Sequence, residues 1–261
     1  MYTDVSLEGQ TAVITGASAG IGEACAAALA HEKVNLILCA RREEKIRNLA
    51  RQLEETYGVS VRPVVLDVRD RKAVKEFASQ LSSEGLGIDI LVNNAGLARG
   101  KDPLQSADMD DWDEMIDTNV KGLLYMTRGI APLMLESSSA PLIINIGSIA
   151  GMQAYEGGGV YCATKAAVGM ISDGLRIDTV SSAMRVCNIR PGLAETEFSL
   201  VRFHGDNDKA QKVYQDLEPL YAGDIADAVR YVCTRPSHVQ ISQLTIMPTR
   251  QASGSVVHRG D

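Results

Sequence analysis

Ser148, Tyr161 and Lys165 carry side chains that can move a proton. Tyr161 and Lys165 are four residues apart in a stretch without proline, so a helix there would place both on one face. An ammonium group beside a phenol favours the phenolate, and we therefore expect the pKa of Tyr161 to fall from about 10 toward neutrality. Such a phenol can exchange a proton with an alcohol or carbonyl oxygen, to which Ser148 can hydrogen-bond. A solvent-exposed helix face would show the same spacing, so the rest of the chain must decide between these interpretations.

The segment that leads to these residues is typical of a parallel sheet. The apolar run Leu142–Ile146 predicts a buried strand that delivers Ser148 at its end. Other strands are expected at Thr11–Thr15, Val34–Cys39, Val61–Leu66, Ile88–Val92, Met184–Ile189 and Val239–Met247. Helices are expected at Glu23–His31, Glu43–Tyr57, Arg71–Ser83, Asp108–Glu136, Tyr161–Val180 and Ala222–Thr234, with Pro132 kinking or interrupting the fourth. This alternation predicts an α/β fold with about seven parallel strands, whose carboxyl ends hold the ligands.

A glycine turn joins the first strand to the first helix. Gly16 permits a tight turn, Gly20 lets the backbone approach a pyrophosphate, and Gly22 allows close packing of the helix. The helix N-terminus adds free amides and a positive dipole. The spacing G-x-x-x-G-x-G is one residue longer than the common dinucleotide fingerprint, but the flanking strand and helix favour a nucleotide site over a plain glycine turn.

Two arginines, Arg41 and Arg42, follow the second strand, where an acidic residue would bind the ribose 2′-hydroxyl. Guanidinium groups suit a 2′-phosphate instead. A helix begins near Glu43, and its dipole disfavours cations that serve only as surface charges at its N-terminus. The pair therefore favours NADP over NAD. Asp67, at the end of the third strand, would either bond the adenine amino group or cap the following helix.

Three further segments are each open to two interpretations. Asn119 falls within a predicted helix, where it either has a functional role or serves as a packing or capping amide. Residues 196–203 are a candidate lid over a substrate. From Pro248 the chain turns polar and is either disordered or an arm that spans subunits.

The composition excludes several classes of function. Residues 1–10 lack an apolar signal core, no apolar run approaches membrane-spanning length, and a net charge of −7 argues against binding to nucleic acid or an anionic membrane. The 5 cysteines lack C-x-x-C spacing and the 4 histidines are scattered, so we expect a reduced, cytoplasmic protein without a metal site. The 261 residues fit one α/β domain better than two.

Together these motifs resemble the short-chain dehydrogenase/reductase family over nearly the whole chain. The matching motifs are Thr15–Gly22, Asn93–Gly96, Asn119, Ser148, Tyr161-x-x-x-Lys165 and Pro191–Gly192. The resemblance implies a single-domain, doubly wound (Rossmann) parallel sheet with helices on both faces. It implies that Tyr161 is the general acid/base, that Ser148 positions the substrate oxygen, and that Lys165 binds the nicotinamide ribose. Asn119 would hold a water in a proton relay, while the hydride chemistry belongs to the cofactor.

The same resemblance implies which residues contact NADP(H) and substrate. The cofactor contacts lie in the glycine turn, after successive strands and around the catalytic helix: Gly16, Ser18, Ala19, Gly20, Ile21, Gly22, Arg41, Arg42, Asp67, Val68, Asn94, Ala95, Gly96, Tyr161, Lys165, Pro191, Gly192, Leu193 and Thr196. Ser148, Tyr161 and Arg202 would contact the substrate.

A narrower resemblance is to the NADP-dependent 3-hydroxy acid and serine dehydrogenases, on the segments Met115–Arg128, Pro191–Asp206 and Met247–Ala252. Members of that group oxidise L-serine, L-allo-threonine or acids like 3-hydroxyisobutyrate, and are typically homotetramers. The resemblance makes Arg202, and also Arg190 or Arg185, candidates for the substrate carboxylate, because a carboxylate in a dry pocket needs a cation. Each is otherwise a surface or interface charge. Relatives often carry a small or acidic residue in place of Arg190, which leaves the substrate open.

Three functions are compatible with these motifs. The first is an NADP-dependent dehydrogenase of short 3-hydroxy acids. The second is a broad-specificity carbonyl reductase in biosynthesis, and the third is an NADP(H)-binding sensor without catalysis, which the complete catalytic set disfavours. Residues 1–247 would form the catalytic domain, and residues 248–261 a tail at a subunit interface.

Overall fold

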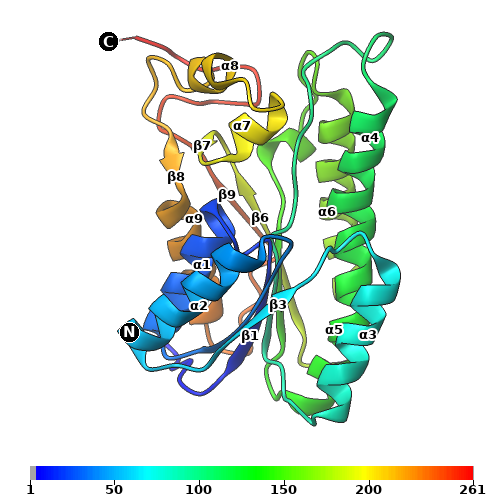
Figure 1. Ribbon diagram of the computed structural model, residues 1–261, viewed down its shortest axis with the longest axis vertical. Coiled ribbons are helices and arrows are strands. Elements are labelled where there is room, and N and C mark those ends of the chain that lie inside the picture. The colour runs from blue at the N-terminus through cyan, green and yellow to red at the C-terminus, as the bar shows by residue number, and fades with distance from the viewer. Residues whose placement is uncertain (1–3, 261) are drawn as a thin grey trace.

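A seven-stranded parallel sheet forms the centre of the protein (Figure 1). The computed structural model describes residues 4–260; Met1–Thr3 of the predicted domain and Asp261 of the predicted tail lie outside the described residues. The strands are β1 (Thr11–Thr15), β2 (Asn35–Ala40), β3 (Val61–Val65), β4 (Ile90–Asn93), β5 (Leu142–Ile146), β6 (Arg185–Pro191) and β9 (Gln243–Ile246). Their order, β3-β2-β1-β4-β5-β6-β9, reverses direction between β1 and β4, and a ligand crevice is expected there at the carboxyl ends. The predicted doubly wound α/β fold is confirmed.

Helices cover both faces of the sheet (Figure 1). On one side lie α1 (Gly20–His31), α2 (Glu43–Tyr57) and α9 (Ala222–Cys233); on the other lie α3 (Arg71–Ser83), α4 (Met109–Ile116), α5 (Leu123–Ser137) and α6 (Gly159–Asp178). Each face has its own apolar core. Leu29, Leu38 and Val229 belong to the first, and Phe77 and Met126 belong to the second. Burial on both faces explains why the strands read as continuous apolar runs.

Capping residues fix two helix boundaries. Gly58 ends α2 with φ 67°, a left-handed conformation that glycine adopts without strain. Asp70 is the N-cap of α3, where its carboxylate accepts from the backbone N–H groups of Lys72 and Ala73. The alternative role of Asp67, as the cap of this helix, is therefore wrong.

The long helix expected at 108–136 is divided into three parts. Between α4 and α5 lies a π-helix, Asp117–Gly122, and it contains Asn119. Pro132 lies inside α5, which continues to Ser137, so the interruption expected at this proline does not occur. The irregular turn falls instead where the Asn119 side chain bonds to the neighbouring loop, as π-turns often do near functional sites.

Residues 194–221 form a cover above the carboxyl ends of the strands (Figure 1). It contains β7 (Ala194–Glu195), α7 (Phe198–Arg202), α8 (Asn207–Lys212) and β8 (Leu220–Tyr221), and β7 pairs with β8. After β9 the segment 248–260 turns back on itself, with a bridge between Gln251 and Val257. Among residues 4–260, no helix has both the length and the apolar character needed to cross a membrane.

Candidate active site

A cleft of about 930 Å³ lies at the carboxyl ends of the strands and extends from Arg41 and Arg42 to Tyr214. The structure brings almost all of the predicted cofactor and substrate residues to this cleft. Those that line it are Gly16, Ser18, Ala19, Gly20, Ile21, Arg41, Arg42, Asp67, Val68, Asn94, Ala95, Gly96, Ser148, Tyr161, Lys165, Pro191, Gly192, Leu193, Thr196 and Arg202. Gly22 and Asn119 lie behind this lining.

The glycine turn has no room for side chains. Gly16 and Gly20 have φ values of 65° and 55°, and a Cβ on Gly20 would lie 3.1 Å from the side chain of Thr196. A Cβ on Gly22 would lie 2.4 Å from the carbonyl oxygen of Gly16, so this glycine permits close packing, as expected. The Asn94 amide clasps the turn by donating to the carbonyl oxygens of Thr15 and Gly16 at 2.9 and 3.2 Å. The turn is thus a rigid cradle that leaves the N-terminus of α1 open to a phosphate.

A cluster of cations marks the far end of the cleft. Arg42, the residue before α2, donates to Ser18 at 3.0 Å and to Glu197 at 2.7 Å. Lys45, in the first turn of α2, donates to the other oxygen of Glu197 at 2.9 Å. These hydrogen bonds hold the pKa of the Glu197 carboxyl below its usual range. Ser18, Arg42 and Lys45 can each hydrogen-bond to a 2′-phosphate or to a carboxylate. In this structure Arg42 and Lys45 bond to the carboxylate of Glu197, which belongs to the predicted lid.

Asp67 is held by a neighbour. Its carboxylate accepts from the Arg69 guanidinium at 2.6 to 3.0 Å and from the Arg69 backbone N–H at 3.0 Å. Burial opposes ionisation of Asp67, but the Arg69 hydrogen bonds outweigh it and lower the carboxyl pKa. Asp67 therefore stays ionised at the edge of the cleft, where it can accept a hydrogen bond.

Tyr161 and Ser148 meet at the base of the cleft. Ser148 is the N-cap of the short turn Ile149–Gly151 that follows β5. Burial raises the Tyr161 pKa well above its ordinary value, and the neighbouring Ser148 hydroxyl lowers it by less. The nearby Tyr155 phenol, which would repel a Tyr161 phenolate when ionised itself, adds to this rise, while the positive charge of Arg202 opposes it. The predicted fall in the Tyr161 pKa is therefore wrong for the chain alone, because the phenolate loses more hydration than its neighbours restore.

Lys165 lies one helical turn beyond Tyr161, on the same face of α6. Its Nζ is 6.0 Å from the centre of the Tyr161 ring and donates to the carbonyl oxygen of Ile146 at 2.8 Å. Burial lowers the Lys165 pKa from 10.5 to about 8. The sequence thus correctly predicts that Tyr161 and Lys165 share one face of a helix. It does not reveal that burial shifts the pKa of both side chains.

Hydrogen bonds fix the side chain of Asn119 behind the lining of the cleft. Its Oδ1 accepts from the Leu97 N–H at 2.8 Å, and its Nδ2 donates to the Leu97 carbonyl at 2.8 Å and to Thr164 at 3.1 Å. Both amide hydrogens are therefore used by the protein. A water could bond only to the second lone pair of Oδ1 or to the backbone of the π-helix.

Arg202 is the one candidate for carboxylate binding that reaches the cleft. Its Nε donates to the carbonyl oxygen of Gly100 at 3.0 Å, and its guanidinium carbon lies 5.8 Å from the centre of the Tyr161 ring. Its Nη2 is buried and has no hydrogen-bond partner. Arg185 lies at the opposite end of β6, where it donates to the carbonyl oxygen of Arg235, and Arg190 does not line the cleft. Both alternatives are wrong: Arg185 lies at the amino end of β6, away from the cleft, and Arg190 lies at the carboxyl end beside Pro191 but is not among the residues that line the cleft.

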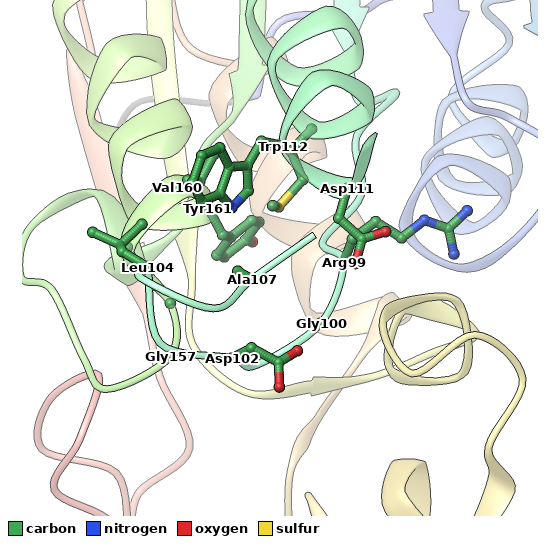
Figure 2. Close-up of a pocket in the computed structure, with 13 residues that line it drawn as sticks. Arg99, Gly100, Asp102, Leu104, Ala107, Asp111, Trp112, Gly157, Val160 and Tyr161 are labelled. Carbon is green, nitrogen blue, oxygen red and sulfur yellow. The ribbon is translucent and has the colours of Figure 1, made fainter. Parts of the chain in front are cut away.

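A second, small cavity of about 20 Å³ lies behind Tyr161, between α4 and the start of α6 (Figure 2). Trp112 lies beside Tyr161 in this view, and the Arg99 guanidinium points away from both. The cavity has room for about one water molecule. Trp112 packs against the small apolar cluster that contains Tyr161, so it supports the position of that ring.

Several residues that line the cleft escape prediction from sequence. Most lie in loops, although Thr118 belongs to the π-helix and Lys209 and Lys212 belong to α8, and none was predicted to contact a ligand: Lys101, Thr118, Tyr155, Lys209, Lys212, Tyr214, Gln251, Gly254, Ser255, Val257 and Arg259. Thr118 and Gln251 lie in segments that carry the narrower family resemblance, and the polar character of the last 14 residues is a second signal, which is equally typical of a disordered end. Among the described residues, no group of His, Cys, Asp and Glu could hold a metal ion.

The fold, the glycine cradle and the Ser148, Tyr161 and Lys165 group together define a nucleotide-dependent oxidoreductase. The short chain dehydrogenase family model matches residues 10–206, and the chain belongs to this family.

Named relatives match along nearly their full lengths. The chain is 44% identical over 254 residues to the NADP-dependent 3-hydroxy acid dehydrogenase of Schizosaccharomyces pombe, covering 97% of this chain and 98% of that protein. It is 44% identical to sulfoacetaldehyde reductase 2 of Chromohalobacter salexigens, covering 92% and 94%. Among solved structures, the closed form of a serine dehydrogenase complexed with NADP+ is 45% identical, with a TM-score of 0.88 and coverage of 96% and 100%.

Proposed function

We propose that the protein transfers a hydride between NADP(H) and the 3-hydroxyl or 3-oxo group of a short hydroxy acid, such as serine, allo-threonine or 3-hydroxyisobutyrate. One observation carries the choice of substrate: the buried, unpartnered Nη2 of Arg202 lies beside Tyr161. A buried guanidinium nitrogen without a partner favours an anionic ligand. The names of the relatives support the same class of substrate.

The cleft fits a dinucleotide with a 2′-phosphate. The cradle of Gly16 and Gly20 would hold the pyrophosphate, and Arg41 and Arg42 would hold the 2′-phosphate. Lys165 would bond the nicotinamide ribose, and Pro191 would border the ring. When bound, the cofactor donates or accepts the hydride.

The residues of this chain supply orientation and the proton. Arg202 would fix the acid group of the substrate, and Ser148 would hold its reacting oxygen within reach of the Tyr161 phenol. In reduction, Tyr161 gives its proton to that oxygen; in oxidation, it takes the proton back. A phenol is protonated at neutral pH, and burial raises the pKa of Tyr161 further, so Tyr161 holds the proton that reduction requires.

Lys165 would take part in a relay that carries the Tyr161 proton to or from solvent. Its ammonium can donate to a ribose hydroxyl in place of the Ile146 carbonyl, and a water held near Asn119 would carry the proton onward. We also propose that residues 1–247 act as one catalytic domain, that the chain forms a homotetramer, and that the protein works in the cytoplasm.

A panel of substrates tests this proposal. Purified protein with NADP is given L-serine, L-allo-threonine, 3-hydroxybutyrate and 3-hydroxyisobutyrate, and with NADPH it is given sulfoacetaldehyde, neutral ketones and bulky aldehydes. NADPH absorbance reports turnover. Turnover of hydroxy acids with the highest kcat/KM supports the assignment. Good activity on neutral ketones with none on any acid would reject it in favour of a broad carbonyl reductase, and NADPH binding without turnover would favour a sensor.

Arg202→Met tests the choice of residue. We expect KM for acids to rise about 30- to 150-fold, since a charge-assisted hydrogen bond contributes roughly 2–3 kcal/mol, while neutral ketones change little. Arg51→Met is the matched control, because Arg51 is exposed on α2 and does not line the cleft. An equal loss on acids and ketones would show that Arg202 only supports the fold.

A further inference from the structure

The C-terminal segment 248–260 lies on the cleft of its own chain. Backbone hydrogen bonds from Ala252 to Val256 and from His258 to Arg250 fold it into a short hairpin. Five of its residues line the cleft: Gln251, Gly254, Ser255, Val257 and Arg259. The match to the family model ends at residue 206, so segment 248–260 lies outside the part of the chain that the family model describes. Figure 1 shows the segment running beside α8, at the same end of the molecule as α7.

Gln251 joins this hairpin to the turn that follows β6. Its side chain is buried, with 4% of the residue exposed. Its Oε1 accepts from the Leu193 backbone N–H at 2.8 Å, and its Nε2 donates to the Ser253 carbonyl at 3.1 Å. Gly192 makes this approach possible, because a Cβ there would lie 2.4 Å from Oε1. One amide therefore fixes both the hairpin and the turn.

The turn at Pro191–Leu193 has few other anchors. The Gly192 N–H donates to the Ile246 carbonyl at 2.7 Å, and the Leu193 carbonyl accepts from the Leu220 N–H at 2.9 Å. Ser148 contacts the Pro191 carbonyl only at 3.5 Å. Without Gln251, the Leu193 N–H would lose its one hydrogen-bond partner within the protein. The position of this turn relative to Ser148 therefore depends on Gln251.

The far end of the segment closes the substrate end of the cleft. Arg259 donates to the carbonyl oxygens of Val213 and Gln215, just beyond α8. In the middle of the hairpin, a Cβ on Gly254 would lie 3.5 Å from the Tyr155 ring, whose centre is 5.6 Å from the Arg202 guanidinium. The hairpin therefore spans from the turn after β6 to the groups around Arg202.

We propose that segment 248–260 is the wall that limits substrate size, and that Gln251 is a positioning residue that holds the Pro191–Leu193 turn against the cofactor site. The limit on substrate size rests on the proposed function. The role of Gln251 concerns only the position of a backbone turn and does not depend on which substrate the enzyme uses. The wall restricts the cleft to short acids, and bulky carbonyl compounds are excluded by the hairpin.

Hydrogen exchange tests the positioning role directly. Gln251→Met keeps the volume of the side chain but removes the acceptor for Leu193. We expect the Leu193 amide to exchange at least tenfold faster in this variant, and kcat/KM for the best substrate to fall about 10- to 100-fold, as small misplacements in active sites commonly cause. Val256→Ala is the matched control, because Val256 is exposed in the same hairpin and does not line the cleft. Unchanged exchange at Leu193 would overturn the role of Gln251, whatever substrate the enzyme uses.

A glutamate adds a readout that a general loss of stability would not produce. Gln251→Glu keeps an acceptor for Leu193, but its carboxylate faces the Ser253 carbonyl; once protonated, it regains the donor. We expect the activity of this variant relative to the natural enzyme to rise severalfold as pH falls through the carboxyl pKa. A ratio that does not change with pH would contradict the proposal.

Removal of the wall tests the size limit. A chain that ends at Met247 should raise kcat/KM for bulky ketones relative to short acids by about tenfold or more. If that chain does not fold, Gly254→Leu replaces it: a side chain there would fill the cleft beside Tyr155 and lower kcat/KM for larger substrates before smaller ones. An unchanged ratio in the variant that folds would overturn the size limit. Absence of turnover in the natural protein would instead overturn the proposed function, and the exchange at Leu193 would still test Gln251.

Discussion

Burial controls the two titrating residues of the candidate site. Burial raises the pKa of the Tyr161 phenol, so this group holds its proton more strongly than an exposed tyrosine does, and the Lys165 amine is only partly charged near pH 8 because its pKa is lowered. Both shifts favour the neutral form of a buried group. The protein thus keeps both titrating groups, the Tyr161 phenol and the Lys165 amine, away from water.

Tyr161→Phe removes the proton donor and leaves the ring. We expect kcat to fall by about 10² to 10⁴, the usual contribution of a general acid, because Ser148 cannot replace the phenol. NADPH binding, followed by fluorescence titration, should change less than about threefold, since the shape of the cleft is kept. Turnover close to that of the natural protein would remove Tyr161 from its assigned role.

Lys165→Met should increase stability while it abolishes activity. The folded-state pKa of about 8 lies below the unfolded value of 10.5, so the unfolded chain binds more protons between these values and the stability of the natural protein rises with pH across that window. At pH 7 the buried charge is fully penalised, and methionine should raise the free energy of unfolding by about 1–3 kcal/mol. Urea unfolding at pH 7, 8, 9 and 10 measures this. The advantage of the variant should shrink as pH rises, and a variant less stable than the natural protein at pH 7 would contradict the argument.

The elements show what the sequence can and cannot predict. Strands, helices and the glycine turn follow from local apolar patterns and punctuation, and Gly58 ends α2 as expected. The π-helix at Asp117–Gly122 does not, since it depends on Asn119 bonding a loop far away in the chain. The hairpin at 248–260 is equally hidden, because Gln251 reads as an ordinary polar residue until the turn after β6 lies against it. Features made by long-range contacts thus escape a local reading.

The N-terminus of α2 carries the prediction of cofactor choice. Arg41→Ala with Arg42→Ala should weaken NADP about 10²- to 10⁴-fold, because each of the two lost charge-assisted contacts to phosphate is worth roughly 1.5–3 kcal/mol, whereas NAD should change by less than about threefold. Arg47→Ala, whose side chain pairs with Glu43 on the same helix, is the control. Titration with both nucleotides gives the dissociation constants.

Glu197 complicates this result in a measurable way. Once Arg42 is lost, the carboxylate of Glu197 keeps Lys45 as its partner and adds a negative charge beside the phosphate site. Addition of Glu197→Gln to the double variant should therefore recover part of the NADP affinity. Equal weakening of NAD and NADP by the arginine changes would show that the pair does not read the 2′-phosphate.

For the whole molecule, the outer surface of α6 is unusual. Met170 and Ile177 are 71% and 70% exposed and lie two turns apart, and small exposed residues, Ala163 and Ala166, precede them on this helix. Exposed apolar side chains aligned on one helix mark an interface more often than a free surface. The predicted homotetramer would bury this stripe against the same helix of a second subunit.

Met170→Asp with Ile177→Asp tests this interface. Four buried carboxylates around a two-fold axis would repel one another without partners, so we expect a tetramer to dissociate to smaller species at micromolar concentration. Light scattering after size exclusion gives the mass, and circular dichroism checks the fold. Val256→Asp is the comparison, because Val256 is exposed on the C-terminal hairpin that the sequence assigned to an interface. If only this comparison variant dissociates, the hairpin and not α6 joins the subunits; if neither does, both surfaces face solvent.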